Sequence, residues 1–285
     1  MRIKLSWILS VAAFALLIAV GAVAGEIPAN DKAKENANPN NPAINDWQLT
    51  PPGLEKIVFI HYKKDFGRPS GCNNDGKCQG WESAGCADCV GGGNGNGESK
   101  CYDFLGKEVK WSELPVSYVV DPDNPDGLSE SFVTSAILNS AEEWDNHTIK
   151  ELFDNSYTVD YNSSWDSDAP DGRNELVFDS YSDPNAIAVT VVWGYFTGPP
   201  KSRRIIEFDT LFNTDFVWGD AAVDPSKMDL QNIATHELGH GIGLDDLYDS
   251  ACAEQTMYGY SDYGEIAKRA LEKGDIAGLT KLYGN

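Results

Sequence analysis

The stretch HELGHGIGLDD, residues 236–246, brings together side chains that could bind a metal ion and move a proton. His236 and His240 are four residues apart, so on a helix their imidazoles project from the same face at neighbouring turns. Two imidazoles presented in this way suit zinc, and Glu237 between them can act as a base toward a water molecule beside the metal. We therefore interpret the stretch as a zinc site rather than as a solvated helix face with two idle histidines.

The residues around the histidines predict the helix that would present them and the turn that would end it. Ala234, Leu238 and Ile242 repeat every four residues on the opposite face, which supplies an apolar stripe for burial. Gly243 follows His240 by three residues. Glycine permits a left-handed turn, so the helix can end there and the chain can fold back toward the metal.

The full pattern H-E-x-x-H-x-x-G-x-x-D, followed by TMYGY, resembles the metzincin zinc peptidases, and the tail GDIAGLTKLYG resembles the C-terminal helix of the matrixin group. The resemblance implies that His236, His240 and Asp246 bind a catalytic zinc ion. It also implies that Glu237 is the general acid/base and that Met257 forms a hydrophobic floor under the metal.

The chain also departs from the matrixin pattern. Asp246 stands where matrixins have histidine, and Gly259 replaces a proline that helps to wall their substrate pocket. Asp275 matches a carboxylate that supports this region in matrixins, although a helix N-cap is an equally good interpretation. A zinc peptidase of another clan would take its third ligand from a later glutamate such as Glu265, but the positions of Gly243 and the methionine turn speak against that.

Two further kinds of metal site are conceivable. Matrixins hold a structural zinc ion with several histidines, whereas this chain has only His61 and His147 outside the motif, so we expect that site to be missing. The acidic loops Asp121–Asp126 and Asp166–Asp171 carry aspartates at a spacing that suits calcium. Acidic turns in an acidic protein explain these loops equally well.

The remaining pattern predicts an α+β domain over residues 102–285. Ser129 can cap a helix with apolar residues on one side through Trp144, and further alternating or apolar runs predict strands at 114–121, 175–181, 186–195 and 204–210. The family resemblance implies a metzincin-like catalytic domain with a twisted mixed sheet, an active-site helix and a C-terminal helix. The strand at 186–195, AIAVTVVWGY, is our candidate for an edge along which an extended polypeptide would pair.

The first 101 residues divide into three segments. Residues 1–24 begin with basic side chains and an apolar run that ends in Ala-Val-Ala, which is typical of a signal peptide, with an uncleaved anchor as the alternative. Residues 25–55 are rich in Asn, Pro and charge and predict a disordered leader. Residues 56–101 start with the strand-like KIVFIHY and hold a cysteine cluster and a Gly-rich linker, so we interpret them as a small disulfide-rich module.

The number of cysteines predicts one long-range bond. Five cysteines lie between Cys72 and Cys101, and the sixth is Cys252. Five cannot all pair among themselves, so full oxidation predicts a disulfide between Cys252 and the cluster. The sequence FGRPSGC has a cysteine near Arg and Pro but lacks the arrangement of the matrixin cysteine switch.

The net charge and the hydropathy of the chain limit the classes of partner that it can bind. The net charge of −22 speaks against nucleic acid, because phosphates would be repelled. A second apolar run of membrane-spanning length does not follow the first, so we expect an exported, monomeric protein without stable membrane insertion after signal removal. Together with the metal-binding motif and the resemblance to metzincins, these features predict a secreted zinc-dependent endopeptidase that acts on polypeptides. The alternative is a non-catalytic extracellular binding protein on a protease-like scaffold, against which the intact Glu237 speaks.

Overall fold

The computed structural model describes residues 53–64, 100–165 and 167–284, so the predicted signal peptide, most of the leader and most of the cysteine-rich module lie outside the described residues. Every described residue belongs to a single compact unit, 40–285. The described helices include none that is long and apolar enough to cross a membrane. The elements are β1 (Glu55–Lys63), β2 (Val119–Val120), α1 (Glu130–Asp145), β3 (Thr158–Val159), β4 (Glu175–Asp179), β5 (Ala186–Tyr195), η1 (Pro200–Ser202), β6 (Arg204–Asn213), β7 (Trp218–Gly219), β8 (Met228–Asp229), α2 (Leu230–Gly241), η2 (Ser250–Cys252), β9 (Tyr260–Ser261), η3 (Ala267–Arg269) and α3 (Lys273–Tyr283).

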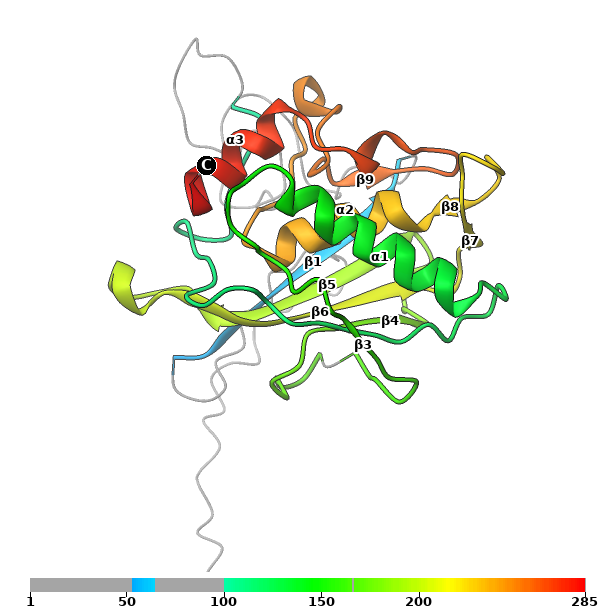
Figure 1. Ribbon diagram of the computed structural model, residues 1–285. Coiled ribbons are helices and arrows are strands. Elements are labelled where there is room, and N and C mark those ends of the chain that lie inside the picture. The colour runs from blue at the N-terminus through cyan, green and yellow to red at the C-terminus, as the bar shows by residue number, and fades with distance from the viewer. Residues whose placement is uncertain (1–52, 65–99, 166, 285) are drawn as a thin grey trace, which may run out of the picture. The chain divides into compact units, whose positions relative to one another are not determined.

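A seven-stranded mixed sheet forms one layer, in the order β3-β2-β4-β6-β5-β1-β9. β2, β3, β4 and β6 run parallel, whereas β5 is antiparallel to both β6 and β1. The helices lie together over one face of this sheet (Figure 1). The α+β fold with a mixed sheet is therefore confirmed.

The helices predicted from the apolar stripes and N-caps are present at the expected positions. Ser129 caps α1 by accepting a hydrogen bond from the backbone N–H of Phe132 at 3.2 Å. Trp144 on its buried side is fully enclosed, and its indole N–H donates to the carbonyl of Thr235 in α2 at 2.8 Å. This bond and the shared apolar core fix α2 between α1 and the sheet.

The strand predicted at 114–121 is less regular than its alternating pattern indicates. Regular pairing is confined to Val119–Val120, while Val116 makes an isolated bridge to Phe153. Val116, Tyr118 and Val120 nonetheless face the core as alternation predicts. The segment is extended, but it changes partners along its length.

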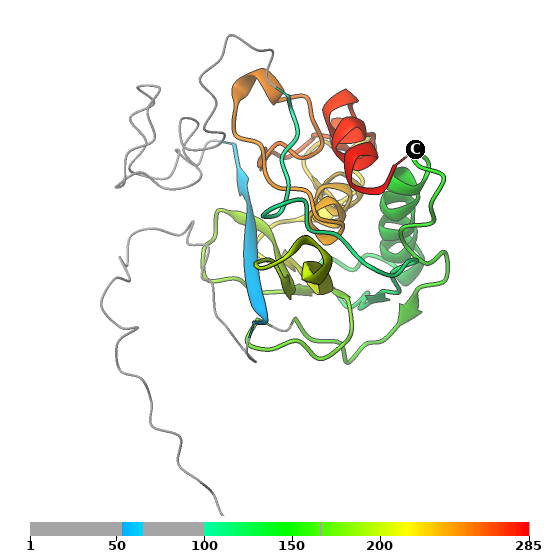
Figure 2. The same cartoon turned by 90° about the vertical axis from the view of Figure 1, so that its left-hand side faces the viewer.

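β1 changes two of our expectations. Its residues, which we assigned to the cysteine-rich module, pair with β5 from Glu55↔Gly194 to Tyr62↔Ala186 and belong to the main sheet. β5 is consequently an interior strand, and the prediction that 186–195 forms a free edge is wrong. The physical reason is that β1 takes up the hydrogen-bonding groups along that side of β5. Figure 2 shows β1 as the blue strand along one side of the described domain.

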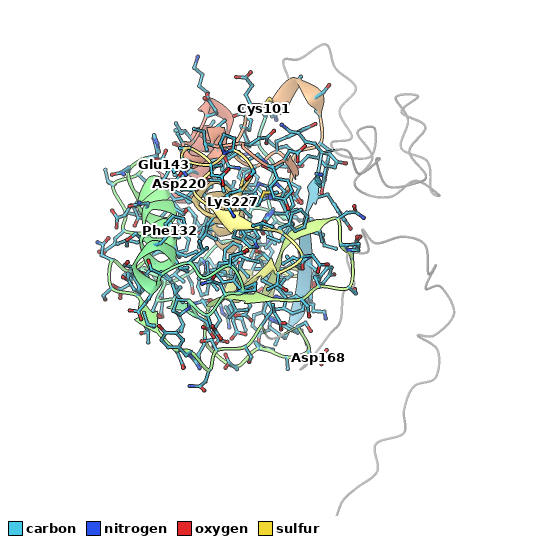
Figure 3. All side chains as sticks on the ribbon, turned by 90° about the vertical axis from the view of Figure 1, so that its right-hand side faces the viewer. Cys101, Phe132, Glu143, Asp168, Asp220 and Lys227 are labelled. Atoms are coloured by element: carbon cyan, nitrogen blue, oxygen red, sulfur yellow. A yellow bond between two sulfur atoms is a disulfide. The ribbon has the colours of Figure 1, made fainter. Side chains whose placement is uncertain are left out.

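The predicted long-range disulfide joins Cys101 to Cys252 across a sequence separation of 151 residues. Cys101, labelled in Figure 3, precedes the folded part of 102–285, and Cys252 closes η2 just after the predicted metal-binding motif. The bond therefore ties the end of the cysteine-rich segment to the loop that follows the motif. The other four cysteines lie outside the described residues.

Candidate metal centre

Helix α2 presents both histidines of the motif from one buried face. Asp229 caps the helix by accepting a hydrogen bond from the N–H of Asn232 at 2.9 Å. The stripe of Ala234, Leu238 and Ile242 is fully buried in the main core. The predicted amphipathic arrangement thus holds the helix firmly enough to aim the two imidazoles.

Backbone carbonyls fix the orientation of each imidazole. Nδ1 of His236 lies 2.7 Å from the carbonyl of Thr256, and Nδ1 of His240 lies 3.0 Å from the carbonyl of Leu244. A carbonyl can only accept, so both Nδ1 atoms donate and both Nε2 atoms are the ones free to bind a metal. These two Nε2 atoms are 3.1 Å apart.

The turn after α2 brings Asp246 back to the histidines. Gly243 has φ of 105°, and an ideal Cβ there would lie 2.3 Å from the carbonyl oxygen of Val109, so only glycine fits. Oδ1 of Asp246 then lies 3.2 Å from Nε2 of His236 and 3.6 Å from Nε2 of His240. The structure therefore brings together all three ligands that the family resemblance implies.

The three ligand atoms fit a zinc ion. Atoms at about 2.0–2.2 Å from one tetrahedral ion lie about 3.3–3.5 Å from each other, close to the observed separations of 3.1, 3.2 and 3.6 Å. Oδ1 of Asp246 is buried and has no hydrogen-bond donor among the described residues. The site thus directs two imidazole lone pairs and one unsatisfied carboxylate oxygen to a single buried point. Zinc prefers a ligand set of this kind.

The charges of the metal-free site favour a cation. Burial opposes the charged form of His240, yet the adjacent Asp246 carboxylate outweighs it and raises the pKa of His240 to about 9. Burial likewise opposes ionisation of Asp246, but the two histidines hold its pKa well below the usual range. Burial lowers the pKa of His236 to about 4, so without metal the site keeps one proton on His240. A divalent ion would replace that proton.

Glu237 lies beside the three ligands in a dry environment. Its side chain is fully buried, and burial raises its pKa to about 7. The hydroxyl of Thr190 in β5 donates to Oε2 at 2.7 Å, and Thr190 also shares a hydrogen bond of 2.8 Å with Thr210 in β6. The sheet thus orients a carboxylate whose pKa is near neutral, which suits proton transfer at that pH.

Met257 packs against α2, and Asp275 binds the backbone of the turn that contains Met257. Met257 is buried, and its sulfur is so close to α2 that an ideal Cβ on Gly239 would lie 2.3 Å from it. Asp275 accepts hydrogen bonds from the N–H groups of Thr256 and Met257 at 2.8 and 3.1 Å. Asp275 also accepts a hydrogen bond from the N–H of Glu272 at 3.0 Å in the capping box of α3. The N-cap of this helix is Glu272 and Asp275 is at its third position, so the interpretation of Asp275 as the N-cap itself is wrong.

Tyr248 supports Asp246, the third predicted ligand, and the sequence analysis missed it. Its hydroxyl donates to Oδ2 of Asp246 at 3.0 Å, which orients Oδ1 toward the histidines. A Cβ at Gly259 would lie 2.5 Å from the Tyr248 ring and 3.1 Å from Oδ1 of Asp246. The glycine in place of the family's proline therefore leaves room for the tyrosine that holds Asp246. A tyrosine two residues after the motif was the available signal.

His61 and Lys268 were also missed as part of the site. Nδ1 of His61 lies 3.2 Å from Oε1 of Glu237, and its Nε2 lies 3.2 Å from Nζ of Lys268. Lys268 donates to the carbonyls of Tyr258 and Tyr260, and burial lowers its pKa to about 7. Burial also holds the pKa of His61 well below its usual value, so the ring is neutral and donates from Nδ1 to the carboxylate. A histidine on the apolar face of KIVFIHY was the signal.

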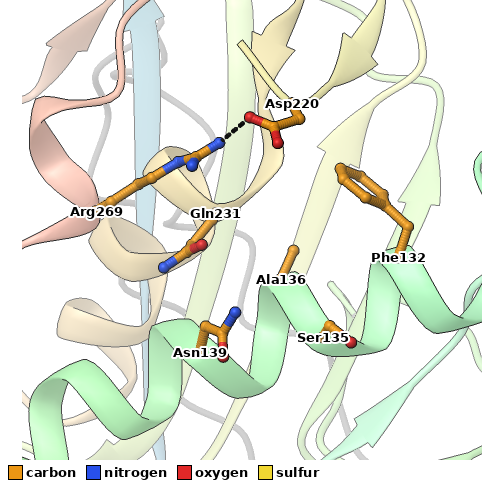
Figure 4. A pocket seen from close by; sticks show the side chains of 7 residues that line it. All are labelled: Phe132, Ser135, Ala136, Asn139, Asp220, Gln231 and Arg269. Atoms are coloured by element: carbon orange, nitrogen blue, oxygen red, sulfur yellow. Dashed lines mark hydrogen bonds and ion pairs between the residues drawn. The ribbon is translucent and has the colours of Figure 1, made fainter. Parts of the chain in front are cut away.

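The other candidate groups lie apart from this centre. In the described part of the chain, the groups of three or more possible ligands are His61-His236-Glu237 and His236-His240-Asp246. The described residues of the two acidic loops therefore contribute no such group, and Asp166 lies outside the described residues. Glu265 instead binds Lys64 and the hydroxyl of Ser261. A small surface pocket between α1 and α2 contains none of the predicted ligands (Figure 4). There Arg269 pairs with Asp220.

Comparison with known proteins identifies the family. The model of a peptidase family, described as matrixin, matches residues 110–284, which is more than half of the chain. The chain therefore belongs to the matrixin family, and the predicted resemblance is confirmed.

Individual relatives match over parts of their length. The chain is 38% identical to rat stromelysin-1 over 77 residues, which are 27% of this chain and 15% of the relative. It is 26% identical to human matrix metalloproteinase-16 over 190 residues (65% and 29%) and 37% identical to rat matrilysin over 76 residues (27% and 27%). The chain thus spans less than a third of the length of each of these relatives.

Proposed function

We propose that this protein is a secreted zinc-dependent endopeptidase that hydrolyses peptide bonds in polypeptides. The observation that carries the proposal is the convergence of two imidazole nitrogens and one carboxylate oxygen, 3.1 to 3.6 Å apart, beside the buried carboxylate of Glu237. Membership of a peptidase family over residues 110–284 supports the same reaction class. The signal-like first 24 residues support export.

Each residue has a defined task in this proposal. His236, His240 and Asp246 hold the zinc ion, which would polarise the scissile carbonyl and make a nearby water molecule more acidic. Glu237 accepts a proton from the attacking water and returns it to the nitrogen of the leaving amine. Thr190 keeps the carboxylate oriented for both transfers. Met257 packs against α2 and keeps the floor of the site apolar.

The alternative of a non-catalytic binding protein explains less of the site. A scaffold does not require a carboxylate whose burial raises its pKa to about 7, because that burial costs stability at neutral pH. Such a costly group is expected where a proton must be transferred. The arrangement around Glu237 therefore favours an enzyme.

Digestion of unfolded casein tests the proposal. The zinc-loaded protein should release peptides, and both a chelator and Glu237→Gln should abolish the release. Metal analysis should show that Glu237→Gln still binds zinc, since Glu237 is outside the ligand set. Glu151→Gln, an identical change at an exposed position, is the control and should keep the parent rate. Peptide release that neither the chelator nor Glu237→Gln reduces would refute the mechanism.

A further inference from the structure

A segment outside the family match pairs with the turn that returns Asp246 to the histidines. This segment, residues 101–105, precedes the match at 110–284, and we call it the brace. Phe104 of the brace forms an antiparallel bridge with Leu244 of the turn. Two backbone hydrogen bonds complete the bridge, from the N–H of Leu105 to the carbonyl of Gly243 at 2.9 Å and from the N–H of Asp245 to the carbonyl of Asp103 at 3.1 Å. The brace therefore holds the backbone immediately before Asp246.

The pairing with the brace also fixes the carbonyl that orients His240. The carbonyl oxygen of Leu244 lies 3.0 Å from Nδ1 of His240 and accepts a hydrogen bond from it. Groups of this kind set the direction of a ligand ring, and their loss weakens metal binding although they do not touch the metal. Because the bridge to Phe104 fixes the direction of the Leu244 backbone, the brace supports His240 as well as Asp246.

The disulfide joins the brace to the loop that orients the other histidine. Cys101 is bonded to Cys252 in the orange loop of Figure 3. The carbonyl of Cys252 accepts a hydrogen bond from the N–H of Gln255 at 3.0 Å, which closes a turn. The next residue is Thr256, whose carbonyl accepts a hydrogen bond from Nδ1 of His236 at 2.7 Å. The disulfide thus connects the backbone supports of all three ligands.

The start of α3 packs directly against the brace. An ideal Cβ on Gly274 would lie 2.0 Å from the carbonyl oxygen of Cys101 and 2.4 Å from Oε1 of Gln255. The N–H of Gly274 donates to the same Oε1 at 2.7 Å. Glycine at this position therefore lets the brace and the loop after Cys252 pack together on one end of the helix.

We propose that the brace and the Cys101–Cys252 disulfide position the three ligands, and that the zinc affinity of the centre depends on this bond. The proposal rests on zinc binding at the centre of the proposed peptidase, although it does not depend on the hydrolytic step. Without the bond, the brace and the loop after Cys252 move independently, so the carbonyls of Leu244 and Thr256 no longer hold the two imidazoles in one arrangement. The ligands must then be ordered when the ion binds, which lowers the affinity.

Competition for zinc with a coloured chelator measures the effect. Cys101→Ser/Cys252→Ser should bind zinc about 10- to 100-fold more weakly than the parent, the range expected when the outer supports of metal ligands are lost. The visible spectrum of bound cobalt(II), which reports the geometry of the ligands, should change as well. No reductant is added, so the other four cysteines are the same in both proteins.

Leu152→Ala is the control for a loss of stability alone. Leu152 is fully buried, and its carbonyl accepts a hydrogen bond of 2.7 Å from the N–H of Val116, in the segment of β2. The metal centre contacts β1 and β5, near the other end of the sheet. A cavity at Leu152 lowers the free energy of unfolding, but the zinc affinity of the folded protein should stay within about twofold of the parent, because the two places are independent.

Equal zinc affinity in the parent and in Cys101→Ser/Cys252→Ser would overturn the proposal, whatever the change in stability. So would an equal loss of affinity in Leu152→Ala. If Cys101→Ser/Cys252→Ser fails to fold, Gly274→Ala decides by the same measurement, because its Cβ displaces the brace while the disulfide stays intact. A loss beyond that of Leu152→Ala would then support the proposal, and an unchanged affinity would overturn it.

The outcomes separate this proposal from the proposed function, because zinc affinity is measured without substrate. A parent that binds zinc, loses affinity with the disulfide and does not digest casein would refute the peptidase and support the positioning role. A parent that digests casein and binds zinc as tightly without the disulfide would do the reverse. A parent that binds no zinc would overturn both.

Discussion

Glu237→Gln should stabilise the metal-free protein at pH 8 while it abolishes the proposed activity. Burial raises the pKa of Glu237 from 4.5 to about 7. The difference of about 2.5 pH units, at about 1.36 kcal/mol each, corresponds to at most ~3.4 kcal/mol of unfavourable free energy when the carboxylate is ionised in the folded state. Glutamine removes that charge but accepts one hydrogen bond fewer. We therefore expect a net gain of about 2 kcal/mol in the free energy of unfolding.

The sign of the pH dependence follows from the direction of the shift. An acid whose pKa is raised by folding contributes its full stability below the unfolded value of 4.5 and loses it as the pH rises through about 7. The parent therefore carries the penalty at pH 8 and little of it at pH 5. Glutamine does not titrate, so the advantage of the variant should be small at pH 5 and largest at pH 8.

Urea unfolding of both proteins between pH 5 and 8, with chelator and without reductant, measures the effect. Glu151→Gln is the control for the same chemical change at an exposed position, and its difference from the parent should not vary in this range. A Glu237→Gln variant that is no more stable than the parent at pH 8 would refute the reasoning. So would a gain that is equally large at pH 5.

Two further predictions concern the ligand and the disulfide. Asp246→Ala should lose most of the bound zinc, whereas Asp245→Ala and Asp249→Ala should keep it; metal analysis that finds full zinc in Asp246→Ala would remove it from the ligand set. Cys101→Ser/Cys252→Ser should lower the free energy of unfolding by about 3–5 kcal/mol, because the native bond closes a loop of 151 residues in the unfolded chain. Unfolding in urea that matches the parent would contradict this.

The sequence predicts the parts of the site that depend on local spacing. His236 and His240 are one helical turn apart, so the period of the helix alone places them together. The apolar stripe of α2 and the glycine that ends its turn are equally local, and the structure shows both as predicted. Asp246 is near enough in the chain for the turn geometry to return it to the same point.

The parts that the sequence could not predict depend on distant partners. The pattern of KIVFIHY predicts a strand but does not say which strand it pairs with, and β5 is more than a hundred residues away. The identity of the edge strand therefore could not be inferred, and β5 was wrongly expected to be free. Thr190 and Lys268 escaped notice for the same reason, because a threonine in a strand and a lysine in a turn become significant only beside Glu237 and His61.

Gly239→Ala should show how tightly Met257 packs against α2. Alanine favours a helix interior by about 1 kcal/mol over glycine, but a Cβ at this position would lie 2.3 Å from the sulfur of Met257 and 2.7 Å from the Trp144 ring. Both neighbours are buried, so relieving the overlap requires the turn around Met257 to move. The carbonyl of Met257 accepts a hydrogen bond of 2.8 Å from the N–H of Leu247, the residue after Asp246, so movement of this turn would also displace Asp246. Overpacking costs about 1–3 kcal/mol, which outweighs the helical preference.

Gly241→Ala is the matched comparison, because it adds the same methyl group to the same helix. Its Cβ would lie 3.1 Å from the Phe208 ring, a contact that a shift of a few tenths of an ångström relieves. Gly239→Ala should therefore unfold at a lower urea concentration than Gly241→Ala and bind zinc more weakly. If Gly239→Ala matches or exceeds Gly241→Ala in both measurements, the methionine turn is free to move away, and Met257 does not constrain the position of Asp246.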